Sequence, residues 1–520
     1  MRISAIVGVL FGIGQYSLFS FLGTTRAQII PGDYTGPLRP QVHFSPPQFF
    51  MNDPNGCFLD SNGTWHLYYQ YNPTDITPGN QHWGHATSKD LYHWENQPIA
   101  IFPPDNTSQV FTGSAVIDVN NTSGFFPDQD NGIVAIYTLN TPTKEIQAIS
   151  FSRDGGFTFT AFDGNPIIDS TTMSFRDPKV IQFQGSWVMV VAFSADLVVA
   201  IYTSPDLKTW THASNFTHAD IGELFECPNL VEIPIDGSDE TKFILSISTN
   251  PGPNKGTTMK YLVGDFNGTH FIPDPTDNVV RVVDAIKDSY AGQYFYGLPD
   301  NEAVFIAWAT NGDYASDLPT ASEGWRSSQT LPRRNSLTNV SGQGWDLVSS
   351  PFDLSPVTGP ALANATEVVN NSMSIDYSDV SSNALYFEAD ITGLTSTASG
   401  GLLNFTFSSP TSGESLSGVY QLSNNTFNLD RNNTRGFDNT AFEDPSSFDV
   451  SVSPDADGNL SVAAVIDRSI IEVFLNGGKL SGTALFYPTE PLRIFSVSTE
   501  AMPPDAKVTV GVWALNSVWV

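Results

Sequence analysis

Short hydrophobic and aromatic runs recur along the first two thirds of the chain, and their starts lie about 54 to 68 residues apart. Gly, Asp and Pro residues separate them, and no long stretch has a helical period. An interval of this length fits a propeller blade of four strands. The runs cover residues 65–71, 133–139, 187–193, 242–248 and 303–309. We therefore expect an all-β fold with a five-bladed β-propeller over residues 39–345; an ordinary β-sandwich with chance similarity is the alternative.

The pattern changes after Trp345. Residues 346–371 are rich in Pro, Ser and Asn, a composition typical of a linker. Residues 372–520 return to alternating hydrophobic runs, such as 384–390 and 470–474, separated by Asp-Gly and Asn-Gly turn signals. This segment predicts a C-terminal β-sandwich.

The N-terminus has the layout of a secretory signal peptide over residues 1–27. Arg2 precedes an apolar run over residues 3–22, and small and polar residues follow up to Ala27. A single membrane anchor is the alternative, but Gly and polar residues interrupt the run. Thirteen Asn-x-Ser/Thr sequons favour export. We expect a secreted, N-glycosylated protein, extracellular or associated with the cell wall, with no membrane contact after cleavage.

Charge and cysteine content narrow the function. The 520 residues carry 23 Lys and Arg against 54 Asp and Glu, a formal net charge of -31, which repels phosphate backbones and excludes nucleic acid as a partner. Cys57 and Cys227 are the only cysteines in the sequence, so the fold does not depend on a disulfide framework. We expect both to be buried thiols.

Three acidic residues stand at similar places before three of the recurring runs. Asp53, Asp177 and Glu226 lie about 12, 10 and 16 residues before the starts of their runs. Each neighbouring Asp-Pro or Asn-Gly pair could be an ordinary turn. Independent turns need not share a phase, however, and the innermost strand of every propeller blade faces the axis. The sequence therefore predicts that the three carboxylates converge in one pocket.

Converging carboxylates suit either a metal ion or the hydrolysis of a glycosidic bond. The sequence has no loop with calcium-type spacing, and His82, His85 and His93 do not repeat in other blades. We therefore expect no metal. Glycoside hydrolysis needs one carboxylate as nucleophile or base and a second group as proton donor. A third can accept hydrogen bonds from sugar hydroxyls.

A set of motifs spread from about residue 39 to the C-terminus resembles glycoside hydrolase family 32, which contains invertases, exo-inulinases and fructosyltransferases. The motifs are Met-Asn-Asp-Pro-Asn-Gly at 51–56, Gln-Tyr-Asn-Pro at 70–73, Trp-Gly-His-Ala at 83–86, Phe-Thr-Gly-Ser-Ala at 111–115, Phe-Arg-Asp-Pro at 175–178, Glu-Cys-Pro at 226–228, Asp-Ser-Tyr-Ala at 288–291 and Asp-Arg-Ser-Ile-Ile-Glu-Val-Phe at 467–474.

The resemblance implies a propeller joined to a β-sandwich, and roles for the three acids. Asp53 would be the nucleophile, forming a covalent fructosyl-enzyme with retention of configuration. Glu226 would be the general acid and base, and Asp177 would bind fructose hydroxyls and stabilise the transition state. The resemblance implies no cofactor and no metal. It also places Asn52, Gln70, Phe111, Thr112 and Arg176 in the fructose pocket.

The sequence thus predicts a retaining β-fructofuranosidase that releases terminal fructose from sucrose and short fructans, small carbohydrates being its partners. Alternatives are a fructosyltransferase that makes fructooligosaccharides from sucrose, an exo-inulinase, an inverting five-bladed glycosidase and a non-catalytic fructan-binding lectin. The sandwich domain either supports the propeller or forms a homodimer.

Three positions depart from the family pattern, which has Trp where this chain has Phe50, Pro78 and Gly312. A lost indole surface at the rim would alter how a leaving group or acceptor sugar stacks. The alternative is that a nearby residue such as Trp325 refills the space.

Overall fold

The structure is a computed structural model that describes residues 29–340, 344–394 and 400–519. Within these residues the chain is almost entirely β, as expected; the helices are α1 (Thr440–Glu443) and three short 3-10 helices over Ser194–Asp196, Pro319–Glu323 and Asn476–Gly478. None of the described helices is both long and apolar enough to pass through a lipid bilayer. The expected signal peptide over 1–27 lies outside the described residues.

Five sheets follow one another along residues 49–351 of the described chain. The first contains β1 (Phe49–Leu59), β2 (Trp65–Asn72), β3 (His82–Ser88) and β4 (Trp94–Ile101), with β20 (Trp325–Arg326) beside β1. The second contains β5 (Gln109–Ile117), β6 (Ile133–Asn140), β7 (Glu145–Ser152) and β8 (Thr160–Ala161), and the third β9 (Phe175–Phe183), β10 (Ser186–Phe193), β11 (Val198–Ser204) and β12 (Thr211–Phe216).

The fourth sheet contains β13 (Glu226–Pro234), β14 (Thr241–Thr249), β15 (Thr258–Phe266) and β16 (Phe271–Pro273), with β17 (Arg281–Val282) on β15. The fifth contains β18 (Tyr290–Tyr294), β19 (Val304–Ala309), β22 (Arg333–Val340) and β23 (Gly344–Pro351), with β21 (Ser328–Gln329) on β19. Each of the five recurring hydrophobic runs lies on the second strand of its sheet. These strands are β2, β6, β10, β14 and β19.

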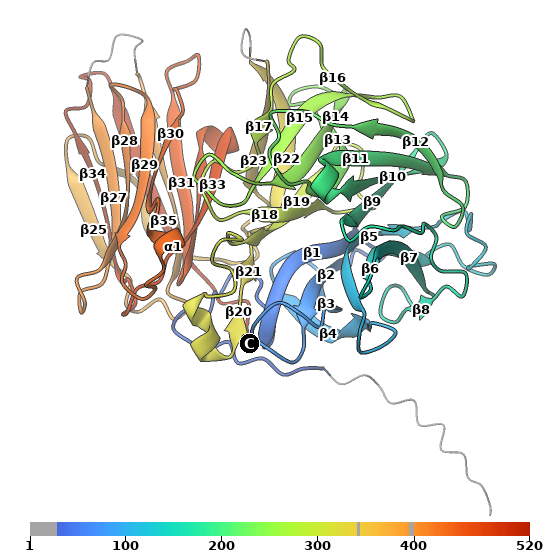
Figure 1. The fold of residues 1–520 in the computed structure, drawn as a ribbon. Coiled ribbons are helices and arrows are strands. Elements are labelled where there is room, and N and C mark those ends of the chain that lie inside the picture. Colours follow the sequence, from blue (N-terminus) through green and yellow to red (C-terminus); the bar gives the residue numbers. More distant parts are fainter. Residues whose placement is uncertain (1–28, 341–343, 395–399, 520) are drawn as a thin grey trace, which may run out of the picture.

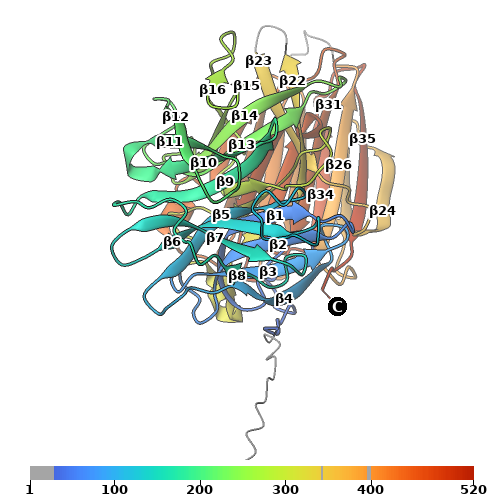
Figure 2. The ribbon, with the colours of Figure 1, turned by 90° about the vertical axis from the view of Figure 1, so that its right-hand side faces the viewer.

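The first strands of these sheets surround a common axis. β1 contacts β5, β5 contacts β9, β9 contacts β13, β13 contacts β18, and β18 contacts β1 again. Every residue of β2 is buried, because the faces of neighbouring sheets pack on it from both sides. This radial arrangement, on the right in Figure 1 and turned in Figure 2, is that of a β-propeller.

The C-terminal part is a sandwich of two antiparallel sheets (Figure 1). One contains β24 (Thr358–Glu367), β35 (Lys507–Leu515), β26 (Ala384–Thr392), β31 (Leu460–Asp467), β32 (Ile470–Leu475) and β33 (Leu480–Leu485). The other contains β25 (Ser372–Asp376), β34 (Ile494–Glu500), β27 (Leu402–Ser408), β28 (Ser415–Gln421), β29 (Thr426–Asn433) and β30 (Ser447–Ser451). Leu403, Phe405 and Phe407 alternate along β27 with less buried residues, so one face of each sheet fills the core.

Residues 346–371 contain more regular structure than their composition suggests. β23 continues to Pro351, and β24 covers Thr358–Glu367. β24 is a mostly exposed edge strand that pairs only with β35, and its register with β35 shifts three times. Polar residues and Pro are common on such edges, which explains why the sequence looks like a linker.

A buried network of charges joins the propeller to the sandwich. His43 contacts Asp467 through Nδ1 at 2.9 Å and Glu472 through Nε2 at 3.2 Å. Arg333 donates from Nε to Glu472 at 2.8 Å and from Nη1 to Asp284 at 3.1 Å. All five side chains are buried. Part of the 467–474 motif therefore acts at this interface.

The network also fixes the charge of His43. Burial alone lowers the pKa of this imidazole, but hydrogen bonds from its nitrogens to Asp467 and Glu472, together with their charges, raise it to about 9. The contacts with His43 lower the pKa of the Asp467 carboxyl, and the charge of Arg333, together with the His43 contacts, lowers that of Glu472, although burial opposes both shifts. The carboxylates therefore stabilise the fold above their ordinary pKa values and lose this effect as pH falls.

The stabilisation that His43 provides changes with pH in the opposite direction. Its stabilising effect is complete below the unfolded pKa of about 6.5 and is lost as pH rises through about 9. We predict that the free energy of unfolding falls by on the order of 3 kcal/mol between pH 6.5 and 9.5. Urea titrations at fixed pH values measure this. His43→Gln should flatten the slope, whereas His93→Gln, at an exposed histidine beside Asp90, should leave it unchanged. Equal slopes in all three proteins would contradict the prediction.

Candidate active site

Each of the five innermost strands is distorted near its start. The pairing with the neighbouring strand shifts between Met51 and Pro54 in β1, between Val110 and Gly113 in β5, between Arg176 and Lys179 in β9, between Glu226 and Asn229 in β13, and between Tyr290 and Gln293 in β18. Bulges of this kind redirect side chains and are frequent beside active sites. Asp177 and Cys227 also have positive φ values of 66° and 46°. The backbone is thus bent where the motif residues lie.

Asp53, on β1, is held by a neighbour on its own strand and by two residues from other strands. Thr112 on β5 donates from Oγ1 to Asp53 Oδ2 at 2.6 Å, and Asn52 donates from Nδ2 to Oδ1 at 3.1 Å. Gln81 in turn donates to Asn52 Oδ1 at 2.8 Å. The thiol of Cys227 lies 3.5 Å from Asp53 Oδ2. These contacts fix the orientation of the carboxylate toward the cavity.

Asp177, on β9, meets the same thiol. Cys227 Sγ is 3.5 Å from Asp177 Oδ2, and the Cys227 backbone N–H donates to that oxygen at 3.0 Å. The Asp177 N–H donates to Thr138 Oγ1 at 3.0 Å. One residue of β13 therefore brings the carboxylates of β1 and β9 together. Cys57 and Cys227 are both buried, free thiols, as expected.

Glu226 begins β13 and is bound from two sides. Arg176 Nη1 donates to Oε1 at 3.1 Å, and the Tyr290 hydroxyl donates to Oε2 at 2.8 Å. The Arg176 guanidinium is itself held by buried Glu145, to which Nε donates at 3.0 Å. Asp288, two residues before Tyr290, accepts from Arg431 of the sandwich at 2.7 Å. The sandwich thus supports the strand that carries Tyr290.

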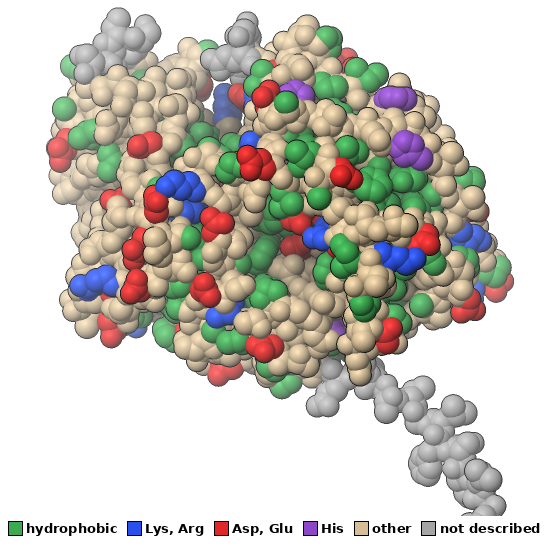
Figure 3. Space-filling model, in the orientation of Figure 1, with side chains coloured by type: hydrophobic (Ala, Val, Ile, Leu, Met, Phe, Trp, Pro, Cys, Tyr) green, Lys and Arg blue, Asp and Glu red, His purple; other side chains and the backbone are tan. Residues whose placement is uncertain are grey.

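A cavity of about 220 Å³ collects these side chains at the start of the innermost strands. All eight residues expected in the pocket line it: Asn52, Asp53, Gln70, Phe111, Thr112, Arg176, Asp177 and Glu226. On the face shown in Figure 3, acidic and basic side chains meet in a hollow of the propeller. Gln81, Tyr290 and Trp308 also line the cavity. Tyr290 belongs to the Asp-Ser-Tyr-Ala motif at 288–291. No sequence motif indicated a role for Gln81 or Glu145 in the site.

Burial and neighbouring charges raise the pKa of two of the three acids. Burial raises the pKa of Asp53, although the hydrogen bonds from Thr112 and Asn52 oppose this shift. Burial and the neighbouring Glu226 carboxylate raise the pKa of Asp177 well above its ordinary range, and Arg176 only partly offsets them. Raised pKa values of this kind are frequent among acids at catalytic sites.

The three departures from the family pattern have different surroundings. Phe50 is buried and packs edge-on against Trp308, with ring centroids 6.1 Å apart. Pro78 and Gly312 are exposed. Trp325 is buried, with Arg39 over its ring at 4.5 Å, and is not part of the cavity lining. Trp325 therefore does not refill the pocket wall, and Trp308 provides the indole that lines it.

Comparisons with known proteins agree with this geometry. A pocket of carboxylates with a proton donor, a guanidinium and amides has the groups that a glycoside hydrolase needs. Residues 43–351 match the family model "Glycosyl hydrolases family 32 N-terminal domain", and residues 358–513 match "Glycosyl hydrolases family 32 C terminal". The chain belongs to glycoside hydrolase family 32.

Among the described residues, no group of three or more His, Cys, Asp or Glu side chains is arranged to hold a metal ion.

Relatives cover nearly the whole chain. An invertase of Schizosaccharomyces pombe is 35% identical over 528 residues, which cover 96% of this chain and 88% of the relative. An extracellular exo-inulinase of Meyerozyma guilliermondii is 37% identical over 485 residues, covering 89% of this chain and 93% of that protein. The solved structure of a Schwanniomyces occidentalis β-fructofuranosidase complexed with fructosyl-erythritol is 33% identical, with a TM-score of 0.86, and covers 93% of this chain and 99% of the other.

Proposed function

We propose that the protein is a secreted, retaining β-fructofuranosidase that releases terminal fructose from sucrose and short fructans. The observation that carries the proposal is the shared environment of the three acids. Asp53 and Asp177 approach one thiol at 3.5 Å each, and Glu226 lies in the same cavity beside Arg176 and Tyr290. Similarity to an invertase, an exo-inulinase and a β-fructofuranosidase supports the substrate class.

In the first half of the reaction, an Asp53 oxygen attacks C2 of the terminal fructosyl unit. The bond between C2 and the bridging oxygen breaks, and protonated Glu226 gives its proton to that oxygen. The Tyr290 and Arg176 hydrogen bonds hold Glu226 in place for this transfer. The products of this step are the leaving sugar and a fructosyl ester of Asp53.

In the second half, ionised Glu226 takes a proton from water, and the resulting oxygen attacks C2. The ester bond breaks, fructose leaves with its original configuration, and Asp53 and Glu226 return to their first states. Asp177 accepts hydrogen bonds from fructose hydroxyls and stabilises the positive charge that develops at C2. Thr112 and Asn52 stabilise ionised Asp53 between turnovers.

The architecture proposed for this function is a five-bladed propeller over residues 39–345, whose blades are the five consecutive sheets, followed by a linking segment over 346–371 and a sandwich over 372–520. The closed series of contacts among the innermost strands supports the blade assignment. Residues 1–27, as a signal peptide, and the thirteen sequons support secretion with N-glycosylation. The extracellular exo-inulinase among the relatives has the same location.

A fructosyltransferase is the second candidate within the same chemistry. Exposed Pro78 and Gly312 stand where the family pattern has Trp, so two aromatic surfaces that could stack an acceptor sugar are absent. We propose on this ground that water is the main acceptor. A non-catalytic lectin is disfavoured, because such a protein has no need for a guanidinium and a tyrosine directed at Glu226.

Removal of either reacting carboxylate tests the assignment. We predict that Asp53→Ala and Glu226→Ala each lower kcat for sucrose by roughly a thousandfold or more, with an unchanged circular dichroism spectrum. Matched changes at exposed acids outside the cavity, Asp128→Ala and Glu240→Ala, should leave kcat unchanged. Near-native turnover by either catalytic variant would remove that residue from its proposed role.

The Thr112 hydrogen bond provides a test of pH dependence. Ionised Asp53 is required for attack, so activity is lost as pH falls through the pKa of Asp53. Thr112→Val removes a hydrogen bond that stabilises the ionised form of Asp53 and should therefore raise the pKa of Asp53 further. The acid limb of kcat/KM should therefore move to higher pH. Thr107→Val, at an exposed threonine bound to Asp105, is the control and should not move the limb. A shift to lower pH would contradict the assignment.

Product analysis separates hydrolysis from transfer. At high sucrose concentration we expect glucose and fructose in nearly equal amounts throughout the reaction, measured by chromatography. Glucose in clear excess, with kestose-type oligosaccharides, would identify the protein as a fructosyltransferase. A fructosyl adduct trapped on Asp53 by acid quenching is expected in either case and would exclude an inverting mechanism.

A further inference from the structure

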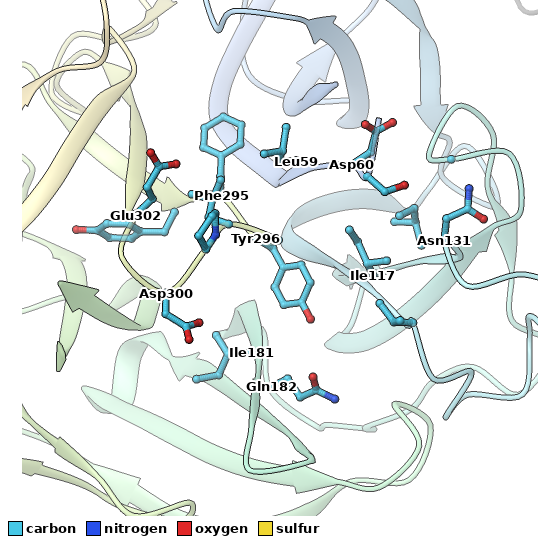
Figure 4. A pocket seen from close by; sticks show the side chains of 18 of the residues that line it. Leu59, Asp60, Ile117, Asn131, Ile181, Gln182, Phe295, Tyr296, Asp300 and Glu302 are labelled. Atoms are coloured by element: carbon cyan, nitrogen blue, oxygen red, sulfur yellow. The ribbon is translucent and has the colours of Figure 1, made fainter. Parts of the chain in front are cut away.

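The propeller contains a second cavity, larger than the catalytic pocket. Its volume is about 760 Å³, within the range of small-molecule sites and more than three times the 220 Å³ of the catalytic pocket. Figure 4 shows the Tyr296 ring in the middle of the lining, with Ile117 to one side and Ile181 and Gln182 below. The proposed catalytic mechanism uses none of these side chains.

The two cavities lie at opposite ends of the same strands. The first residues of each innermost strand line the catalytic pocket and the last residues line the larger cavity, for example Asp53 and Leu59 on β1. On β13, Glu226 lines the catalytic pocket and Val231 lines the larger cavity. On β18, Tyr290 lines the catalytic pocket and Tyr294, the last residue of the strand, lines the larger cavity. Leu59 lies six positions beyond Asp53, which corresponds to at most about 20 Å along a strand. The larger cavity is thus a site apart from the catalytic pocket.

The lining combines flat apolar surfaces with unused polar groups. Phe157, Phe295 and Tyr296 are among its aromatic residues. The backbone of Tyr296 is fixed, since its N–H donates to Cys57 O and its carbonyl accepts from Leu59 N, both at 2.9 Å. Among the described residues, neither the Tyr296 hydroxyl nor the Gln182 amide has a side-chain hydrogen bond. The ring is therefore a rigid platform beside free donors and acceptors.

The charges around the cavity disfavour an anion. The ammonium of Lys179, buried in the lining, is used by Tyr294 O, and no group of three or more described His, Cys, Asp or Glu side chains is arranged to hold a metal ion. An anion would meet the carboxylates of Asp60, Asp154 and other acids in the lining. Asp60 accepts from the Asn62 and Thr64 N–H groups at 2.8 and 2.7 Å through Oδ1 alone, which leaves Oδ2 as an acceptor for a ligand hydroxyl, whereas Thr158 bonds to both oxygens of Asp154 at 2.9 and 2.7 Å.

We propose that this cavity is a second, non-catalytic binding site for a neutral oligosaccharide, whose sugar ring stacks on Tyr296 while its hydroxyls bond to Gln182 and the rim carboxylates. Aromatic faces with amide and carboxylate partners suit a neutral, hydroxyl-rich ligand that is apolar on one face. The choice of a fructan as that ligand rests on the proposed function. A chain bound there would stay near the enzyme between cleavage events.

Calorimetric titration with kestose tests this in the Asp53→Ala variant of the full chain, which binds but does not consume the sugar. We expect two molecules of kestose per chain. Adding Tyr296→Ala or Gln182→Ala should weaken one of the two sites at least about tenfold and leave the other unchanged. Tyr202→Ala, at a half-buried tyrosine that lines neither cavity, is the matched control and should keep both. One molecule per chain, with an affinity that no Tyr296 substitution alters, would overturn the proposal.

Two further measurements distinguish this proposal from the proposed function and from occupation of the cavity by a glycan. With native Asp53, Tyr296→Ala should hydrolyse sucrose within about twofold of the parent rate; a parent that does not hydrolyse sucrose refutes the proposed function, and the kestose stoichiometry still reports on the second site. Asn62 lies in the lining and begins a sequon, so its own glycan is the competing occupant. A second kestose site that appears only in Asn62→Gln would assign the cavity of the native protein to that glycan and overturn the proposal, whereas two kestose molecules bound with or without Asn62 support it.

Discussion

Three carboxyl groups share one buried pocket with a single guanidinium, and the rest of the site is organised around this repulsion. Like charges in a region of low polarity cannot all ionise at neutral pH, so hydrogen bonds must decide which group keeps its proton. Thr112 and Asn52 stabilise the ionised form of Asp53, while burial and the neighbouring Glu226 carboxylate raise the pKa of Asp177 and Arg176 partly offsets them. The fold supplies these partners from strands far apart in sequence, which requires the innermost strands to be fixed relative to one another.

The sandwich contributes to that rigidity. His43 and Arg333 connect the N-terminal segment and the last propeller sheet to Asp467 and Glu472, and all four side chains are buried. A separate contact joins Arg431 to Asp288, two residues before the tyrosine that binds the general acid. Carboxylates and cations that are removed from water cost free energy unless they are fully paired. Their pairing across the interface makes the two parts a single structural unit, in which the sandwich acts on catalysis through position rather than chemistry.

The sequence predicted the main features because they depend on local patterns. The recurring runs became the second, mostly buried strands of the sheets, and the shared phase of Asp53, Asp177 and Glu226 placed all three on innermost strands. Contacts between side chains of different sheets left no such pattern in the sequence. Glu145 holds Arg176 from β7, where its own neighbours read as an ordinary strand start. β24, within residues 346–371, left no strand pattern for a different reason: exposed edge strands are commonly polar, so their composition resembles that of a loop.

The distortions near the starts of the innermost strands bear on how such a protein can change. They occur in all five strands, including β5 and β18, which present no acid to the pocket at that place. The bend is therefore part of the way the ring of sheets is built, and the reacting groups are side chains attached to a framework that exists without them. Evolution can exchange one residue for another at these bends, and so alter substrate or acceptor, while the main chain keeps its path.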